Sequence, residues 1–170
     1  ELFGEEESRE ESNAALVSKL PIALILIFIV LLILFGNLRD PVVVLVTVPL
    51  IFVGVVLGLG VTGKMFDFFS LLGLLGLVGM NIKNAVILIA RIRELRADDY
   101  EPINAVVEAT ADRFIPVVAA SLTTILGMIP LLADSMFGSM AATIMGGLLV
   151  ATLMVLVVLP VVYSLFYRIK

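Results

Sequence analysis

The sequence predicts an all-α membrane protein: a bundle of five transmembrane helices with one short helix on the membrane surface. The first reason is composition, since 61% of its 170 residues are hydrophobic and soluble domains have about 45–50%. The second is pattern, because five apolar runs, each long enough to cross a bilayer alone or with the helix leading into it, alternate with short polar turns. The chain also lacks Cys and His, which bears on chemistry and not on the fold: it excludes disulfide frameworks, histidine metal clusters and Ser–His dyads. We therefore expect no enzyme, no cofactor and no metal site.

The chain opens with an acidic segment, residues 1–15, which belongs in an aqueous compartment and is expected to end a preceding domain. This segment supplies most of the glutamates behind the net charge of −4, so the charge gives no indication of nucleic-acid binding. No signal sequence precedes Glu1, and we expect the chain to be a piece of a longer protein.

Residues 16–167 hold the predicted bundle. The first span covers about 20–36, with Pro21 where a helix can begin or bend. The second covers about 42–60, with Asp40 as the predicted N-cap and Pro41 as the first helical residue. Gly54 and Gly58 form a small-xxx-small pattern in it, which predicts close approach of another helix.

The third span covers about 68–90 and is followed by a long polar interval. Within this interval the apolar periodicity predicts a helix over 101–112 that lies along the membrane surface. The fourth span covers about 114–133 and the fifth about 140–166.

Lys83 is the one full charge in the third run and lies near its middle, beside Asn84. A lysine at that depth costs about 2.5–3.5 kcal/mol on insertion scales, so it marks a functional site. Gly76, Gly79 and Ala90 fall on nearly the same helical face, which predicts packing against another helix. We therefore expect Lys83 to point into protein and to pair with a carboxylate. No predicted span contains Asp or Glu, so that partner would come from outside this chain.

The distribution of cations predicts the orientation. Seven Lys and Arg residues lie on one predicted side and three on the other, which places the first set in the cytoplasm. The acidic N-terminal segment then lies outside the plasma membrane, and the C-terminal end lies in the cytoplasm.

Three motifs make the chain resemble a known family: GLVGMNIKNAVILI, RFIPVVAASLTTILGMIPLL and MFGSMAATIMGGLLVATLMVLVVLPVVYSLF. In this order and spacing they resemble the last transmembrane helices of resistance–nodulation–division (RND) efflux permeases. The match is closest to the hydrophobe/amphiphile drug-efflux branch. The metal-efflux branch typically replaces a Lys-Asn pair, so Lys83-Asn84 favours organic substrates on this resemblance.

The resemblance implies that the five spans are helices eight to twelve of twelve and that residues 1–15 end a periplasmic porter domain. It implies a proton-driven antiporter of the bacterial inner membrane, assembled as a homotrimer with a periplasmic adaptor and an outer-membrane channel. It also implies that Lys83 pairs with two aspartates of the missing N-terminal transmembrane half. The implied partners are that half, the bilayer, protons and hydrophobic or amphiphilic small molecules.

By the same resemblance the proton relay would comprise Lys83, Asn84, Arg113, Ser121 and Thr124. The family threonine that follows the proline by one turn is absent, because that position is Ala120. Ser121, Thr123, Thr124 or a water would take its role.

Several alternatives stay open. Lys83 could make a static ion pair or extend to the headgroups, and Arg113 could be a cytoplasmic anchor. The serine and threonines could bond only to their own helix. At the level of the whole protein, the alternatives are a protein-export auxiliary of the same architecture and a structural membrane-assembly segment without proton coupling.

Overall fold

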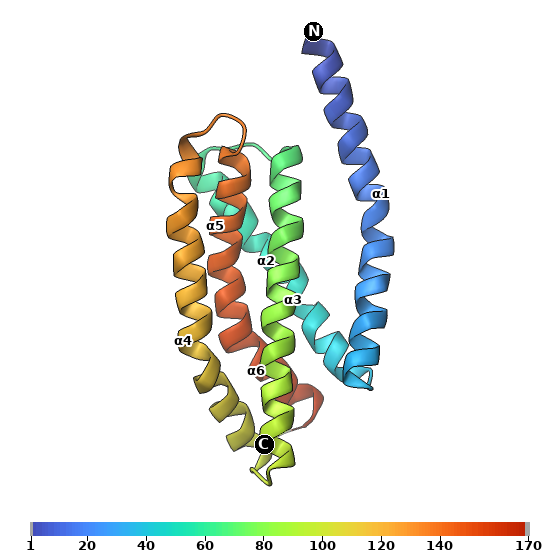
Figure 1. The fold of residues 1–170 in the computed structure, drawn as a ribbon, viewed down its shortest axis with the longest axis vertical. Coiled ribbons are helices and arrows are strands. Elements are labelled where there is room, and N and C mark those ends of the chain that lie inside the picture. Colours follow the sequence, from blue (N-terminus) through green and yellow to red (C-terminus); the bar gives the residue numbers. More distant parts are fainter. Residues whose placement is uncertain (1, 169–170) are drawn as a thin grey trace.

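The computed structural model is all-helical over the residues it describes, 2–168. Five stretches of helix are long and apolar enough to cross a membrane, which confirms the predicted fold class. They are Phe3–Phe35, Arg39–Thr62, Phe68–Ala97, Pro102–Ala133 and Gly138–Phe166. The N- and C-terminal ends lie at opposite ends of the molecule (Figure 1), as an odd number of crossings requires.

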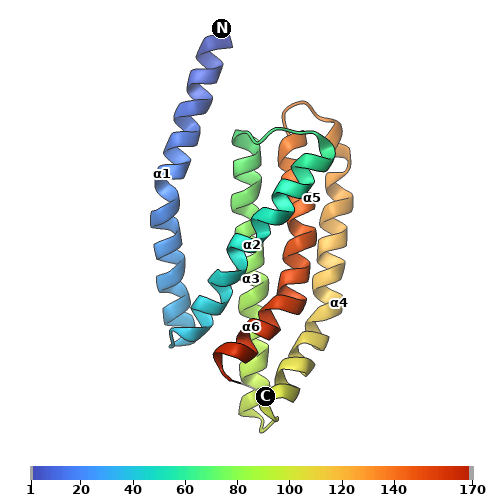
Figure 2. The same cartoon turned by 180° about the vertical axis from the view of Figure 1, so that it is seen from behind.

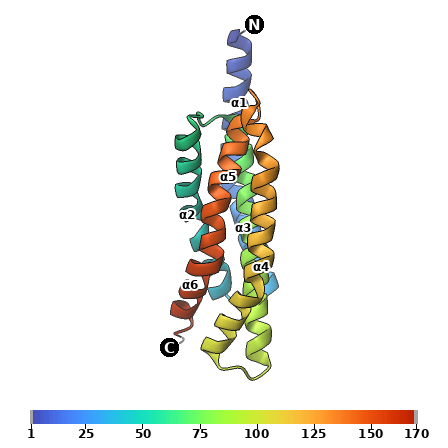
Figure 3. The same ribbon diagram turned by 90° about the vertical axis from the view of Figure 1, so that its left-hand side faces the viewer.

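The first span is part of a much longer helix than the sequence predicts. Helix α1 covers Leu2–Phe35 without a break, with Pro21 inside it. The acidic residues expected as a separate segment before the 20–36 span are therefore its first turns. The N-terminal part of α1 projects beyond the ends of the other helices (Figures 1 and 3).

Helix α2 covers Arg39–Thr62. The predicted N-cap at Asp40 is wrong, because Leu38 occupies the cap position and Asp40 lies in the first turn with its side chain buried. The helix ends at Gly63, whose φ of 67° is a left-handed conformation that glycine adopts without strain.

Helices α3 (Phe68–Ala97) and α4 (Pro102–Met128) form a hairpin. The Asp67 carboxylate caps α3 by accepting a hydrogen bond from the Ser70 backbone N–H at 2.9 Å. At the other end α3 continues past the predicted 68–90 span, where Arg91 pairs with Asp112 at 2.9 Å across the hairpin.

The separate surface helix predicted at 101–112 is wrong, because these residues are the first three turns of a continuous α4. Ala105, Val106 and Ala109 are buried in the same core cluster as Ile92 and Leu95 of α3. The apolar face of this segment therefore packs against α3, which keeps the segment in line with the rest of α4. The periodicity shows that one face is apolar, but not whether a helix or a membrane surface covers it.

The fifth span consists of three consecutive helical pieces. They are α5 (Gly138–Leu153), the π-helical η2 (Met154–Val158) and α6 (Leu159–Phe166). Pro160 cannot donate a backbone hydrogen bond, and the widened turn lies directly before it. Before α5, the predicted 114–133 span is completed by the 3₁₀ helix η1 (Pro130–Ala133).

The tightest helix contact joins α2 and α5, which cross obliquely (Figure 2). A Cβ placed on Gly58 would lie 2.5 Å from the Ala142 carbonyl oxygen, and one on Gly146 would lie 2.5 Å from the Gly54 carbonyl oxygen. The small-xxx-small prediction for Gly54 and Gly58 is thereby confirmed.

Two helices have little of their apolar surface covered within the chain. Only 6% of the most apolar window of α1 and 11% of that of α4 are buried, against 44% for α2. These faces are available to lipid or to further protein, so the chain presents unpartnered surface on two sides of its packed core.

Candidate functional site

The predicted site is a small hollow between the middle of α3 and the middle of α4. It has a volume of about 140 Å³, and Lys83 and Asn84 line it from α3 while Arg113 lines it from α4. The remaining lining residues are Ile87, Pro116, Val117 and Ala120. Two cations and an amide therefore meet over apolar walls near the centre of the Phe68–Ala97 span.

Neither cation of this hollow has a carboxylate partner within the described part of the chain. The ion pairs among residues 2–168 all involve Arg91 or Arg93. Lys83 is exposed, so residues 2–168 leave much of it uncovered. Gly76 and Gly79 likewise have no atom within 4 Å of an added Cβ, so the close packing predicted for this face is not made inside the described chain.

Two further residues predicted for the relay lie outside the hollow. The Ser121 hydroxyl is buried and lies 2.5 Å from the Thr152 hydroxyl of α5. Thr152 donates its own proton to the Leu148 carbonyl at 2.8 Å, so Ser121 is the donor in the pair. Thr124 donates to the Ala120 carbonyl of its own helix at 2.9 Å. Ser121 thus joins α4 to α5, and Thr124 makes only a local bond.

A buried polar contact that sequence reasoning missed joins α2 to α3. The Asn81 amide donates to the Thr47 hydroxyl at 3.0 Å, and both side chains are almost fully buried. The Asn81 amide oxygen has no hydrogen-bond partner among the described residues. In the sequence, Asn81 and Thr47 are polar residues in two separate apolar runs. Nothing in the sequence shows that their side chains meet.

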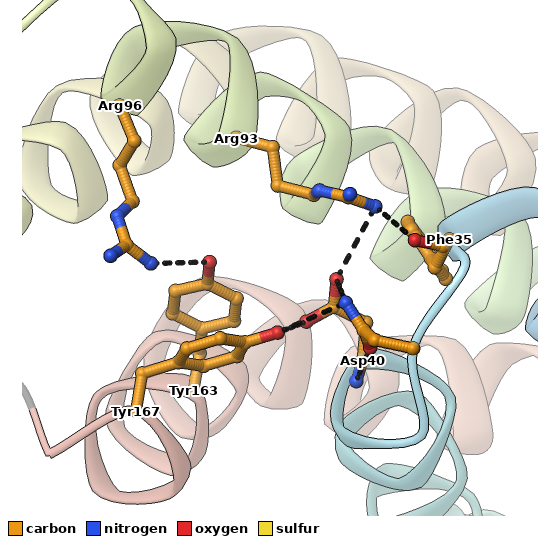
Figure 4. A network of polar contacts seen from close by, with 7 residues as sticks. Phe35, Asp40, Arg93, Arg96, Tyr163 and Tyr167 are labelled. Carbon is orange, nitrogen blue, oxygen red and sulfur yellow. Dashed lines mark hydrogen bonds and ion pairs between the residues drawn. The ribbon is translucent and has the colours of Figure 1, made fainter.

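The largest polar network lies at the end of the bundle where the α1–α2 turn meets the ends of α3 and α6 (Figure 4). We call it the Asp40 cluster, and its members are Asn37, Asp40, Arg93, Arg96, Tyr163 and Tyr167. The sequence did not predict it, because its members are up to 130 residues apart.

Asp40 is the centre of that cluster and is fully buried. Its carboxylate accepts hydrogen bonds from the Tyr167 hydroxyl at 2.5 Å and the Asn37 amide at 3.2 Å, and it lies 3.6 Å from the Arg93 guanidinium. Arg93 also donates to the Phe35 carbonyl at 2.9 Å. A buried carboxylate needs such partners, because an unpaired charge out of water is strongly unfavourable.

Burial and, secondly, the hydrogen bond to Asp40 raise the pKa of the Tyr167 hydroxyl above its ordinary value of 10.0. The phenol therefore stays protonated at neutral pH and remains a donor to the carboxylate. Its ring stacks on that of Tyr163 with centroids 4.5 Å apart. The cluster thus fixes the end of α6 against the start of α2.

No group of three or more carboxylates that could hold a metal ion occurs among residues 2–168.

Five apolar spans, two of which line a cationic hollow, define a multi-pass helical membrane protein. The chain belongs to the AcrB/AcrD/AcrF family, whose model matches residues 1–167. The resemblance to RND permeases that the motifs predict is confirmed at this level.

Two curated relatives show how the chain relates to longer proteins. The swarming motility protein SwrC of Bacillus subtilis (strain 168) is 30% identical over 154 residues, which cover 87% of this chain and 15% of SwrC. The cobalt-zinc-cadmium resistance protein CzcA of Cupriavidus metallidurans is 29% identical over 167 residues, covering 95% of this chain and 16% of CzcA. The chain therefore spans about one sixth of their length.

A solved structure of a longer efflux pump is also similar to this chain. The crystal structure of a heavy metal efflux pump, in its crystal form II, superposes with a TM-score of 0.82 at 33% identity, over 95% of this chain and 17% of that one. The drug-efflux branch predicted from Lys83 and Asn84 has no support in these comparisons. The names of CzcA and of the solved pump both state metals as substrates.

Proposed function

We propose that this chain is the second half of the membrane domain of an RND efflux permease and that its Lys83 hollow couples efflux to proton entry. One observation carries the proposal: Lys83 and Arg113 line one hollow near the centre of the Phe68–Ala97 span, with no carboxylate paired to either among the described residues. A lone intramembrane cation is stable when protein supplies its counter-charge. On the family resemblance, that counter-charge would come from two aspartates of the N-terminal transmembrane half.

The exposed face that carries Lys83 supports this pairing. Gly76 and Gly79 leave space beside the lysine, where no atom of the described chain lies within 4 Å of an added Cβ. Small residues allow two helix backbones to approach closely. A carboxylate-bearing helix seated there would cover Lys83 and restore the interior position that the sequence predicts.

In the first step, ionised aspartates hold the Lys83 ammonium and keep the two helix sets together. A proton from the periplasm then neutralises one carboxylate, and the ammonium loses part of its attraction. Leaving one member of a buried pair uncompensated costs about 3–5 kcal/mol, which is enough to shift a conformational equilibrium strongly. Release of that proton to the cytoplasm restores the pair.

The chain's own groups determine where Lys83 moves when its partner is neutralised. Asn84 lines the same hollow and offers an amide oxygen, whereas Ser121 and Thr124 do not line it. We therefore propose that the Asn84 amide oxygen accepts a hydrogen bond from the displaced Lys83 ammonium. Ser121 instead joins α4 to α5. Arg113, also in the hollow, raises the local positive potential and favours ionised carboxylates.

The movement would reach the porter domain through α1, which is one continuous helix from Leu2 to Phe35. The family further indicates a homotrimer in the bacterial inner membrane, with a periplasmic adaptor and an outer-membrane channel. The N-terminal end of this chain would lie in the periplasm and its C-terminal end in the cytoplasm. The protein would be a transporter and not an enzyme.

Two substrate classes have support. Hydrophobic or amphiphilic molecules are favoured by the Lys83-Asn84 pair on the family resemblance. Divalent metal cations are favoured by the named substrates of CzcA and of the heavy metal efflux pump. The residues that would choose between them lie outside this chain, since RND substrates pass through the porter domains.

The test uses the complete permease in a bacterial strain that lacks its own RND pumps. Growth is measured against zinc and cadmium salts and against ethidium, with Lys83→Met compared with Lys19→Met, which alters an exposed lysine of α1. We expect Lys83→Met to lose protection and Lys19→Met to keep it, at equal membrane levels. Protection by Lys83→Met would favour the structural alternative and contradict the relay.

A further inference from the structure

A second cationic hollow lies at the end of the bundle, beside the Asp40 cluster and away from Lys83. It has a volume of about 350 Å³. Arg93, Arg96 and Ala97 line it from the end of α3, Tyr163 and Tyr167 from the end of the chain, and Asn37 from the α1–α2 turn. Figure 4 shows Arg96 reaching from α3 to the Tyr163 hydroxyl and Arg93 reaching to Asp40 and the Phe35 carbonyl.

Two arginines at this end of the bundle have no carboxylate partner among the described residues. Arg93 pairs with Asp40, which is fully buried and already holds two hydrogen bonds. Arg96 donates only a long hydrogen bond of 3.4 Å to Tyr163. Arg39 does not line the hollow, but its guanidinium lies 5.5 Å from the ring centroid of Tyr167, which does. Neither Arg39 nor Arg96 forms an ion pair with another described residue.

The arginines also have unused donors. A guanidinium carries five N–H groups, and those of Arg96 make one hydrogen bond within the described chain. Arg93 and Arg96 are three residues apart on α3, so they lie on one helical face. Two adjacent planar donors of this kind match the oxygens of a phosphate group, which guanidinium binds with paired hydrogen bonds.

The position identifies the source of the phosphate. The hollow lies where three membrane spans begin or end, at Phe35, Arg39 and Ala97. That is the level of lipid headgroups, where basic pockets between transmembrane helices bind anionic lipid. An apolar groove of about 550 Å³ between α4 and Pro160 of α6 adds lipid-facing surface near the same end.

We propose that this hollow binds the phosphate group of an anionic membrane lipid, held by Arg96 and Arg93 with Arg39 beside them. The site would anchor the ends of α3 and α6 to the headgroup layer. It does not depend on proton coupling, and a permease that fails every transport test could still show it.

The test is native mass spectrometry of the complete permease, purified in detergent and titrated with phosphatidylglycerol or with phosphatidylcholine. The double variant R39Q/R96Q is compared with Arg168→Gln, which removes an exposed cation at the same end that does not line the hollow. At about 1 kcal/mol for each cation, we expect the double variant to bind phosphatidylglycerol about thirtyfold more weakly. Arg168→Gln should change binding less than threefold, and phosphatidylcholine should bind weakly to all three proteins.

Thermal unfolding of each variant confirms that it is folded before the titration. A loss of about fivefold or more in Arg168→Gln, which is what about 1 kcal/mol per cation gives wherever the cation lies, would mean a diffuse attraction and would overturn the site. So would unchanged binding in the double variant. Displacement of phosphatidylglycerol by equimolar inorganic phosphate would identify a soluble anion as the ligand and would overturn the lipid assignment.

Discussion

The contact between α2 and α5 gives the most quantitative prediction. An added Cβ on Gly58 would lie 2.5 Å from the Ala142 carbonyl oxygen and 2.9 Å from the Gly146 Cα. These are backbone atoms, so no side chain can rotate away, and the helices must separate by roughly 1 Å to restore ordinary contact. Gly58→Ala should therefore destabilise the bundle by about 1–3 kcal/mol.

The control is Gly60→Ala, two residues further along the same helix. An added Cβ there meets no atom within 4 Å. Replacing a helical glycine with alanine lowers the entropy of the unfolded chain and should stabilise by about 0.5–1 kcal/mol. The two variants differ by one methyl group each and should shift stability in opposite directions.

The complete permease is heated in detergent at a series of temperatures. Size-exclusion chromatography then measures the fraction that stays soluble at each temperature, which gives the midpoint of thermal unfolding. We expect a lower midpoint for Gly58→Ala and an equal or higher one for Gly60→Ala, each compared with the parent protein. Equal midpoints in Gly58→Ala and the parent would show that α2 and α5 are not in backbone contact, and the close packing of these two helices would be wrong.

Three further predictions follow from single contacts. Tyr167→Phe should cost about 1.5–3 kcal/mol in thermal unfolding, because buried Asp40 loses a hydrogen-bond donor. Ser121→Ala should lower stability by about 0.5–1.5 kcal/mol through the lost bond to Thr152 but leave proton-driven efflux unchanged, and an efflux defect at normal expression would restore Ser121 to the relay. The backbone amides of Phe137 and then Met136 lower the pKa of Asp134 below 3.8, so its ionised form stabilises the fold. The stability advantage of Asp134 over Asp134→Asn should thus be complete above about pH 5 and vanish as pH falls through the lowered pKa, whereas a constant difference would contradict the assignment.

Much of the fold followed from hydrophobic pattern and helix-breaking residues. The five spans and the small-residue contact at Gly54 and Gly58 depend on local sequence, and the structure has them. Helix ends were less predictable. The α3–α4 hairpin extends both helices because Ala105 and Ala109 pack on α3, and the sequence does not show which surface those residues meet.

Part of the site could also be predicted from local sequence. A cation in an apolar run is visible without a structure, and Lys83, Asn84 and Arg113 do line one hollow. The Asp40 cluster was not predicted, because it joins a turn near residue 37 to tyrosines at the other end of the chain. Local sequence predicts Asp40 as a helix cap, because nothing in it distinguishes a cap from a buried ion pair.

The most direct measurement is a cryo-electron microscopy structure of the complete permease at neutral pH. We predict that the Lys83 ammonium nitrogen lies within about 4 Å of a carboxylate oxygen from a helix outside this chain, shielded from lipid and bulk water. An ammonium that instead extends to the headgroups, with its neighbouring helices turned away, would contradict proton coupling through Lys83.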